Sequence, residues 1–93
     1  MKTLADLKRA LGAVGTKFEC EHYLRREISG PRTVAIVQRN AVAVTYDKPG
    51  VGPSVSWCYW GPAANWRIEG NRATYREHTY TDVFSYIIPA QEG

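Results

Sequence analysis

The chain has 93 residues, of which 44% are hydrophobic and 23% are charged. This balance is typical of one small folded domain, residues 1–93, and excludes a wholly disordered chain. The apolar runs are too short to cross a membrane, and charge interrupts residues 1–12 too often for a signal peptide. We therefore expect a cytoplasmic protein with no membrane partner, in which Cys20 and Cys58 are reduced.

The net charge of +3 is unevenly distributed along the chain. Lys and Arg outnumber Asp and Glu by nine to five through Lys48, and the acids lead by four to three after it. A basic first half is consistent with a polyanionic partner, and it is equally consistent with an ordinary solvated surface.

The first predicted element is a helix over residues 3–12, with Thr3 as its N-cap and Gly12 as its stop signal. Its leucines recur at the spacing of one helical face: Leu4, Leu7 and Leu11. A helix this short is not stable alone, so its leucine face must dock on the rest of the domain.

The next segments alternate between polar and apolar residues, which predicts strands. Residues 16–24 form the first, with one face made of Phe18, Cys20, His22 and Leu24. Residues 25–32 are polar and contain Gly-Pro, which indicates a loop. Residues 33–38 and 41–46 are β-branched runs separated by two polar residues, a pattern that predicts a hairpin.

The second half continues the strand pattern after a loop at residues 47–54, which is rich in Pro and Gly. Residues 55–60 form a strand, and residues 66–69 and 73–80 form a hairpin around Gly-Asn. The tail, residues 82–93, is either an edge strand or an arm that packs on a second copy.

Together these elements predict an α+β, mainly β fold. It consists of one short N-terminal helix followed by a small bent antiparallel sheet, or a partly open barrel, of about five to six strands. Such a sheet has exposed edges, and the tail offers a way to close one by dimerisation, so we expect a homodimer or a higher homo-oligomer.

The chain carries no recognisable catalytic or metal-binding motif, so we expect neither an enzyme nor a cofactor. Four possible metal ligands are scattered over four elements without paired spacing: Cys20, His22, Cys58 and His78. Single buried cysteines are common core residues, so we expect neither a metal site nor a disulfide.

All three tryptophans lie within residues 56–70. Alternation along the predicted strand 55–60 places Val55, Trp57 and Tyr59 on one face and Ser56, Cys58 and Trp60 on the other. The first face is wholly apolar or aromatic, so we assign it to the core. We expect Trp66 to join that core beside Ile68, which leaves Trp60 as the tryptophan that the fold least requires.

Arginines interleaved with aromatic residues favour a phosphate-bearing ligand, either a nucleic acid or a small nucleotide, because bases stack on aromatic rings and phosphates bind arginine. The candidate contact residues are Arg25, Arg26, Arg76, Tyr80, Trp60 and Trp66. The surplus of aromatic residues supports an alternative, an inhibitor or adaptor that binds another protein, such as a host protein, through an aromatic surface.

The segments "LADLKRAL", "VGT", "PRTVAIVQRNAVAV" and "SWCYWGPAANWRIEG" are similar to short uncharacterised accessory proteins of phages that infect actinobacteria. The resemblance covers most of residues 4–70, and the chain is longer than the usual pattern after Asn71. It implies a phage-encoded accessory protein acting in the cytoplasm of a bacterial host, and it implies no mechanism and assigns no catalytic or ligand residues. Action against host defence is a separate hypothesis, in which the protein blocks a host or defence factor.

Overall fold

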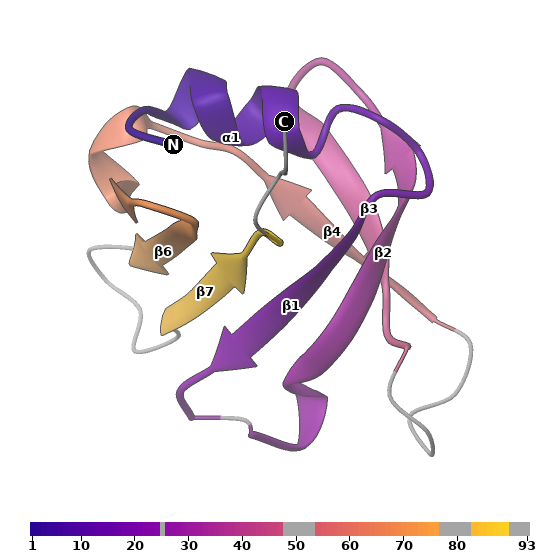
Figure 1. Cartoon of the computed structure of the whole chain (residues 1–93). Helices are drawn as coiled ribbons and strands as arrows, with labels where there is room; N and C mark the ends of the chain where they lie inside the picture. The colour runs from indigo at the N-terminus through magenta and orange to yellow at the C-terminus, as the bar shows by residue number, and fades with distance from the viewer. Residues whose placement is uncertain (25, 48–53, 77–82, 90–93) are drawn as a thin grey trace.

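The computed structural model describes residues 1–24, 26–47, 54–76 and 83–89 (Figure 1). The first half contains the helix and three strands, α1 (Leu4–Ala10), β1 (Lys17–His22), the 3₁₀ turn η1 (Arg26–Ile28), β2 (Gly30–Val37) and β3 (Ala41–Thr45). The second half contains β4 (Val55–Tyr59), the 3₁₀ turn η2 (Ala63–Asn65), β5 (Trp66–Glu69), β6 (Arg72–Arg76) and β7 (Val83–Ile87).

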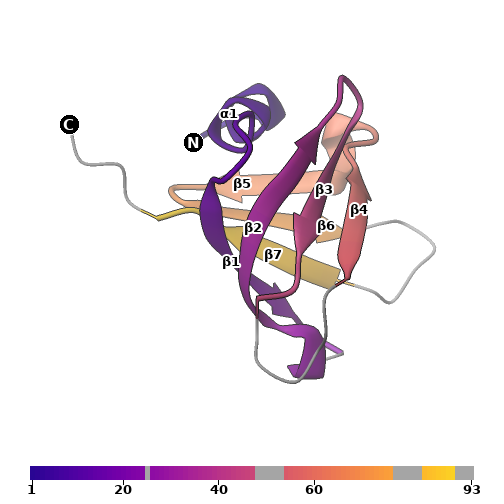
Figure 2. The same ribbon diagram turned by 90° about the vertical axis from the view of Figure 1, so that its right-hand side faces the viewer.

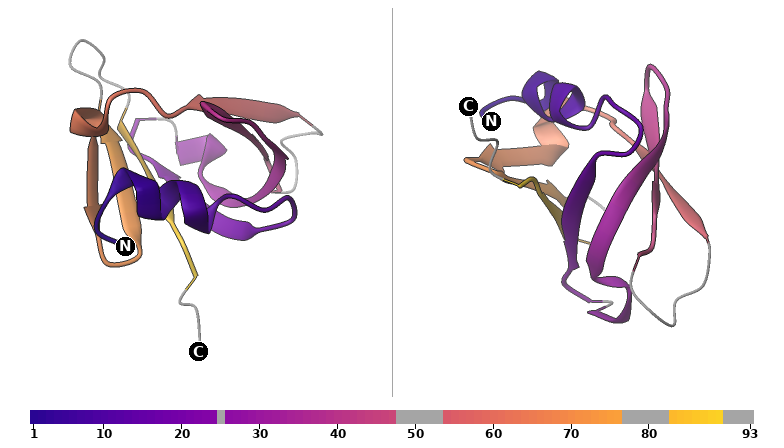
Figure 3. Two further views of the ribbon diagram at one scale, coloured as in Figure 1. Left: turned by 90° about the horizontal axis from the view of Figure 1, so that it is seen from above. Right: turned by 45° about the vertical axis from the view of Figure 1, so that its right-hand side comes forward.

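The seven strands form one antiparallel sheet in the order β4-β3-β2-β1-β7-β6-β5. The sheet bends into a half-barrel, so that β5–β7 run across behind β1–β4, and α1 covers one end (Figure 2; Figure 3 shows the same end from above). This confirms the predicted α+β, mainly β class. The sheet has seven strands rather than five or six.

The N-terminal helix begins where the sequence predicts. The Asp6 backbone N–H donates to the Thr3 hydroxyl at 3.2 Å, and the Asp6 carboxylate accepts from the Thr3 backbone at 3.1 Å, which completes a capping box. Leu7 and Leu11 are fully buried. The leucine face of this short helix is therefore docked on the sheet, as its stability requires.

The tail strand β7 lies inside the sheet, where it pairs with β1 on one side and with β6 on the other. The expectation of an arm or an edge strand is therefore wrong for Val83–Ile87. Phe84 and Tyr86 point into the core and contact each other, with ring centroids 5.1 Å apart. A strand with a buried aromatic face gains most from two neighbours, and the actual edges are β4 and β5.

The largest correction concerns the two faces of β4. Trp57 and Tyr59 are 40% and 69% exposed, whereas Cys58 and Trp60 are buried. The neighbouring strand β3 explains this orientation because it is apolar on both faces: its bulky Val42 and Val44 fill the core, and its small alanines face out. Paired residues share a face, so Cys58 follows Val42 inward and Trp57 follows Ala43 outward.

Trp60 and Trp66 form the aromatic centre of the core, with ring centroids 5.8 Å apart. The Trp66 indole N–H donates to the Trp60 carbonyl at 2.7 Å, which satisfies its polar group. Trp66 also contacts Tyr75 and Phe84. The prediction that Trp66 fills the core is confirmed, and the expectation that the fold leaves Trp60 aside is wrong. In the described ranges, no helix is long and apolar enough to cross a membrane.

Candidate functional site

The structure describes four of the six residues that the sequence singled out. Arg26 lies in η1 and Arg76 at the end of β6, and both are exposed. Trp60 and Trp66 are buried and offer a ligand almost no surface. Arg25 and Tyr80 lie outside the described residues. The described members therefore do not meet in one site.

A different group of side chains gathers on the outside of the half-barrel, over β2, β3 and β4. We call this the aromatic face, and it consists of Ile36, Val55, Trp57 and Tyr59, all exposed. The pairing register places Ile36, Ala43 and Trp57 in one row across the three strands. The rings of Trp57 and Tyr59 lie side by side, with centroids 6.4 Å apart and planes 27° apart.

The local sequence explains why these side chains share one face. The β2–β3 register shifts between Val34 and Ile36, and this irregularity turns Ile36 outward although Val34 points inward. Ala41 and Ala43 lie beneath the larger side chains and are themselves buried. The small alanines lie between Ile36 and the aromatic rings, and Thr45 lies beside Val55 at one end of the face.

The aromatic face is unusual for a solvated surface. Its two rings expose on the order of 200 Å² between them, since a whole aromatic side chain has about 150–250 Å². Strand β4 itself, Val55–Tyr59, contains no charged residue. Large exposed apolar patches mark interaction sites, and Trp and Tyr are the residue types that most often anchor them.

The outside of the other half, over β1, β7, β6 and β5, is polar. We call it the arginine–hydroxyl face, and it consists of Glu21, Tyr23, Arg67, Glu69, Arg72, Thr74, Arg76 and Ser85. The Ser85 hydroxyl lies 2.8 Å from the Thr74 hydroxyl and 3.1 Å from the Tyr23 hydroxyl. Ser85 is completely buried beneath this hydroxyl chain.

Charges on the arginine–hydroxyl face are mostly paired. Arg72 donates to the Glu21 carboxylate at 2.7 Å, and this hydrogen bond raises the pKa of Arg72. Arg67 donates to Glu69 at 3.1 Å. Within the described ranges Arg76 has no carboxylate partner. Arg76 is therefore the one of these three arginines left available for an external anion.

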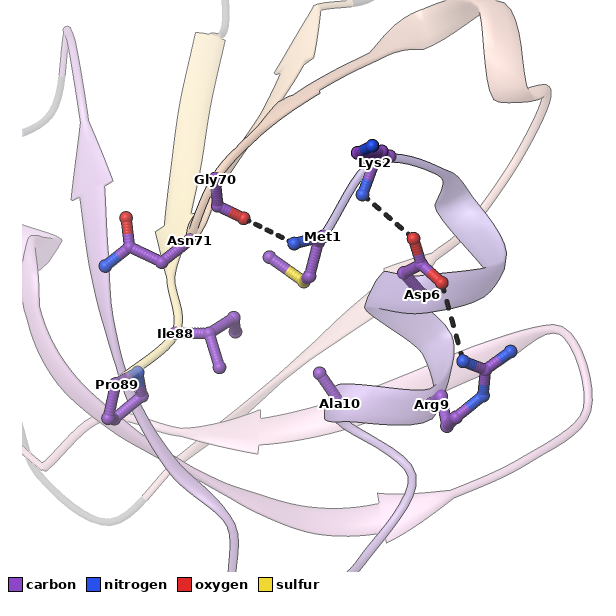
Figure 4. Close-up of a pocket in the computed structure, with 9 residues that line it drawn as sticks. All are labelled: Met1, Lys2, Asp6, Arg9, Ala10, Gly70, Asn71, Ile88 and Pro89. Atoms are coloured by element: carbon purple, nitrogen blue, oxygen red, sulfur yellow. Dashed lines mark hydrogen bonds and ion pairs between the residues drawn. The ribbon is translucent and has the colours of Figure 1, made fainter. Parts of the chain in front are cut away.

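A cleft of about 630 Å³ lies between α1, the β5–β6 turn and the end of β7 (Figure 4). Its polar groups contact one another: the Met1 ammonium donates to the Gly70 carbonyl at 2.7 Å, and Asp6 accepts from Arg9 and from the Lys2 backbone. The hydrogen bonds from Lys2 and Thr3 lower the pKa of Asp6. Of these contacts, the hydrogen bond from Met1 to Gly70 connects the N-terminal segment to the β5–β6 turn.

The core contains two thiols and one buried cation. Burial raises the pKa of Cys58 to about 11 and also raises that of Cys20, so both free cysteines are poor nucleophiles.

Arg32 donates to the Ile28 carbonyl at 2.7 Å, and its guanidinium lies 3.9 Å from the centre of the Tyr46 ring. In the described part of the chain, no cluster of His, Cys, Asp and Glu could hold a metal, and His78 lies outside it.

Comparison of the chain with protein-family models, with curated proteins and with solved structures gave no match. The candidate sites therefore depend on the geometry alone. Alternation along β4 identified Val55, Trp57 and Tyr59 as one set, although it placed that set on the wrong side of the sheet. No pattern in the sequence signalled that Ile36 would join them.

Proposed function

We propose that the protein is a non-enzymatic adaptor or inhibitor that binds another protein through the aromatic face. The observation that carries this proposal is the exposure of the stacked rings of Trp57 and Tyr59 on a strand without charge. If the chain has the phage origin that its resemblance implies, the partner is a protein of the bacterial host.

The composition of the aromatic face supports a protein partner over a polyanion. Trp and Tyr supply large apolar contact area with few rotatable bonds, and they dominate the energetics of protein interfaces. None of the four residues of the face is charged. Arg32 in β2 is buried, Arg39 lies in the turn between β2 and β3, and Asp47 follows the other end of β3. The face therefore has no surplus of positive charge to attract phosphates.

The test is affinity capture from an actinobacterial lysate with the immobilised protein and two variants. Wild type and Leu24→Ala should retain the same stoichiometric partner, because Leu24 is 62% exposed but lies outside the aromatic face. The double variant Trp57→Ala/Tyr59→Ala should bind that partner at least about thirtyfold more weakly. Wild-type affinity in the double variant, or capture of no partner at all, would contradict the proposal.

A second candidate function, binding of a phosphate-bearing ligand, is favoured by Arg76. Its strand places it two residues from the Thr74 hydroxyl, on the face that also carries Arg67 and Arg72. Binding of a single-stranded oligonucleotide should then fall steeply between about 50 and 200 mM salt, because counterions are released. It should also weaken in Arg76→Ala but not in Arg9→Ala. Salt-independent binding, or equal binding by both variants, counts against this candidate.

A further inference from the structure

Strand β4 is an edge of the sheet, and its backbone orientation can be assigned. The Trp60 N–H donates to the Asn40 carbonyl at 3.1 Å, in line with the β3–β4 register. Because the direction of backbone groups alternates along an antiparallel strand, Ser56 and Cys58 also point toward β3. Val55, Trp57 and Tyr59 therefore direct their backbone N–H and C=O groups away from the sheet, toward the outer edge.

This edge lacks the protection that natural sheets place on such strands. Proteins usually block an edge with charged side chains or proline, and Val55–Tyr59 contains neither. The opposite edge, β5, carries Arg67 and Glu69 within its four residues. By the sequence of the described strands, β4 is the one of the two edges on which another strand can pair.

We propose that β4 pairs with β4 of a second copy of this chain, in an antiparallel arrangement centred on Trp57. In this register the free backbone N–H and C=O groups of Val55, Trp57 and Tyr59 in one copy lie opposite the same groups in the other copy. Every opposed pair of these residues can exchange both backbone hydrogen bonds. Val55 of one copy lies opposite Tyr59 of the second copy, a favourable pairing of aromatic and β-branched side chains. No like charges are opposed, because β4 has no charge.

The paired dimer goes beyond binding of a host protein, because it uses the edge of β4 and leaves the aromatic face open. Residues opposed across an antiparallel pair point to the same side, so the two aromatic faces join into one larger surface. The edge contact spans only the five residues of β4 in each copy. Such a small contact gives a weak dimer, with a dissociation constant on the order of micromolar or above.

Sedimentation velocity over a range of concentrations, combined with amide hydrogen exchange, tests this pairing. The wild type should shift reversibly from monomer to dimer, and the amides of Val55, Trp57 and Tyr59 should become protected as the dimer forms. The amides of Ser56 and Cys58 should be protected at every concentration. A strict monomer at millimolar concentration would overturn the proposal. So would a dimer in which the amides of Val55, Trp57 and Tyr59 gain no protection.

A matched pair of variants at Val55 isolates the edge. Val55→Pro removes an outward N–H at the first residue of the strand, where proline is tolerated in an edge strand. It should weaken the dimer at least about tenfold, whereas Val55→Thr, which keeps the N–H, should dimerise like the wild type. A Val55→Pro variant that folds and dimerises normally overturns the pairing. If Val55→Pro does not fold, the wild-type exchange pattern decides.

The experiments distinguish a failure of the β4 pairing from a failure of the proposed binding to a host protein. Loss of the dimer in folded Val55→Pro, with capture of the host partner intact, supports the pairing and shows that the face binds without it. A wild-type dimer with the predicted exchange pattern, together with no captured partner, supports the pairing and rejects the proposed function.

Discussion

The two outward surfaces of the half-barrel differ in how their exposed side chains interact with one another and with water. The arginine–hydroxyl face satisfies most of its polar groups internally, through the pair of Arg72 with Glu21 and the hydroxyl chain through Ser85, and leaves Arg76 exposed. The aromatic face exposes Trp57 and Tyr59 beside other apolar side chains, Ile36 and Val55. Water is a good solvent for the first surface and a poor one for the second.

This difference indicates which surface is adapted to water in the isolated protein and which one favours a partner. Exposed ion pairs contribute little to stability, and their presence indicates a surface adapted to water. The exposed part of an aromatic ring lowers solubility and gains nothing from folding, so its presence on an edge strand favours a contact with another molecule. Measurements on each face, and on the core between them, test this difference between the two surfaces.

The largest effect is expected from the contrast between a core and a face tryptophan. Trp66→Ala should lower the free energy of unfolding by about 3–5 kcal/mol, because it leaves a cavity among several aromatic rings. Trp57→Ala should cost about 1 kcal/mol or less, since its ring is already partly in water. Denaturant titration followed by circular dichroism measures both. Equal losses would show that Trp57 belongs to the core.

A smaller effect is expected on the arginine–hydroxyl face. Ser85→Ala should destabilise the fold by about 1–2 kcal/mol, because it deprives the Thr74 and Tyr23 hydroxyls of a buried partner. Ser54→Ala, at an exposed position before β4, is the matched control and should have almost no effect. The same denaturant titration applies. If the two serine variants were equally stable, the hydroxyl chain would have no structural role.

The smallest effect is a pH dependence beside the aromatic face. Asp47 accepts hydrogen bonds from the hydroxyls of Thr33 and Thr45, and these bonds lower its pKa. The folded carboxyl has the lower pKa, so its contribution is fully present above the ordinary value of about 3.9. It is lost as the pH falls through the folded pKa. The stability difference between wild type and Asp47→Asn should therefore shrink below about pH 4, in thermal unfolding followed across pH; a constant difference would refute this.

Local patterns predicted most of the elements. Alternation along β1 matches its observed burial, and the capping box at Thr3 lies where the sequence indicates the start of a helix. The pairing of β2 with β3 and of β5 with β6 also follows the predicted hairpins. Each of these features depends on residues that are close in the chain.

The faces of β4 could not be predicted from β4 alone. Its Val55/Trp57/Tyr59 face is the more apolar one, so periodicity alone assigns that face to the core, which is the wrong side. The choice depends on the volumes of Val42 and Ala43 in the neighbouring strand, and on a register that only the assembled sheet defines. The turn of Ile36 onto the same face depends on an irregularity that the sequence of β2 does not reveal. The set of exposed aromatic residues was predictable, but its side was not.

The interior position of β7 sets the order in which the molecule can be completed. Val83–Ile87 pairs with β1, which precedes it by more than sixty positions in the chain, and with β6. Until this strand is synthesised, β1 and β6 both present open edges and the Trp66 cluster lacks Phe84 and Tyr86. Contacts between distant segments form slowly. The nascent chain on the ribosome therefore cannot close this core until Val83–Ile87 has emerged.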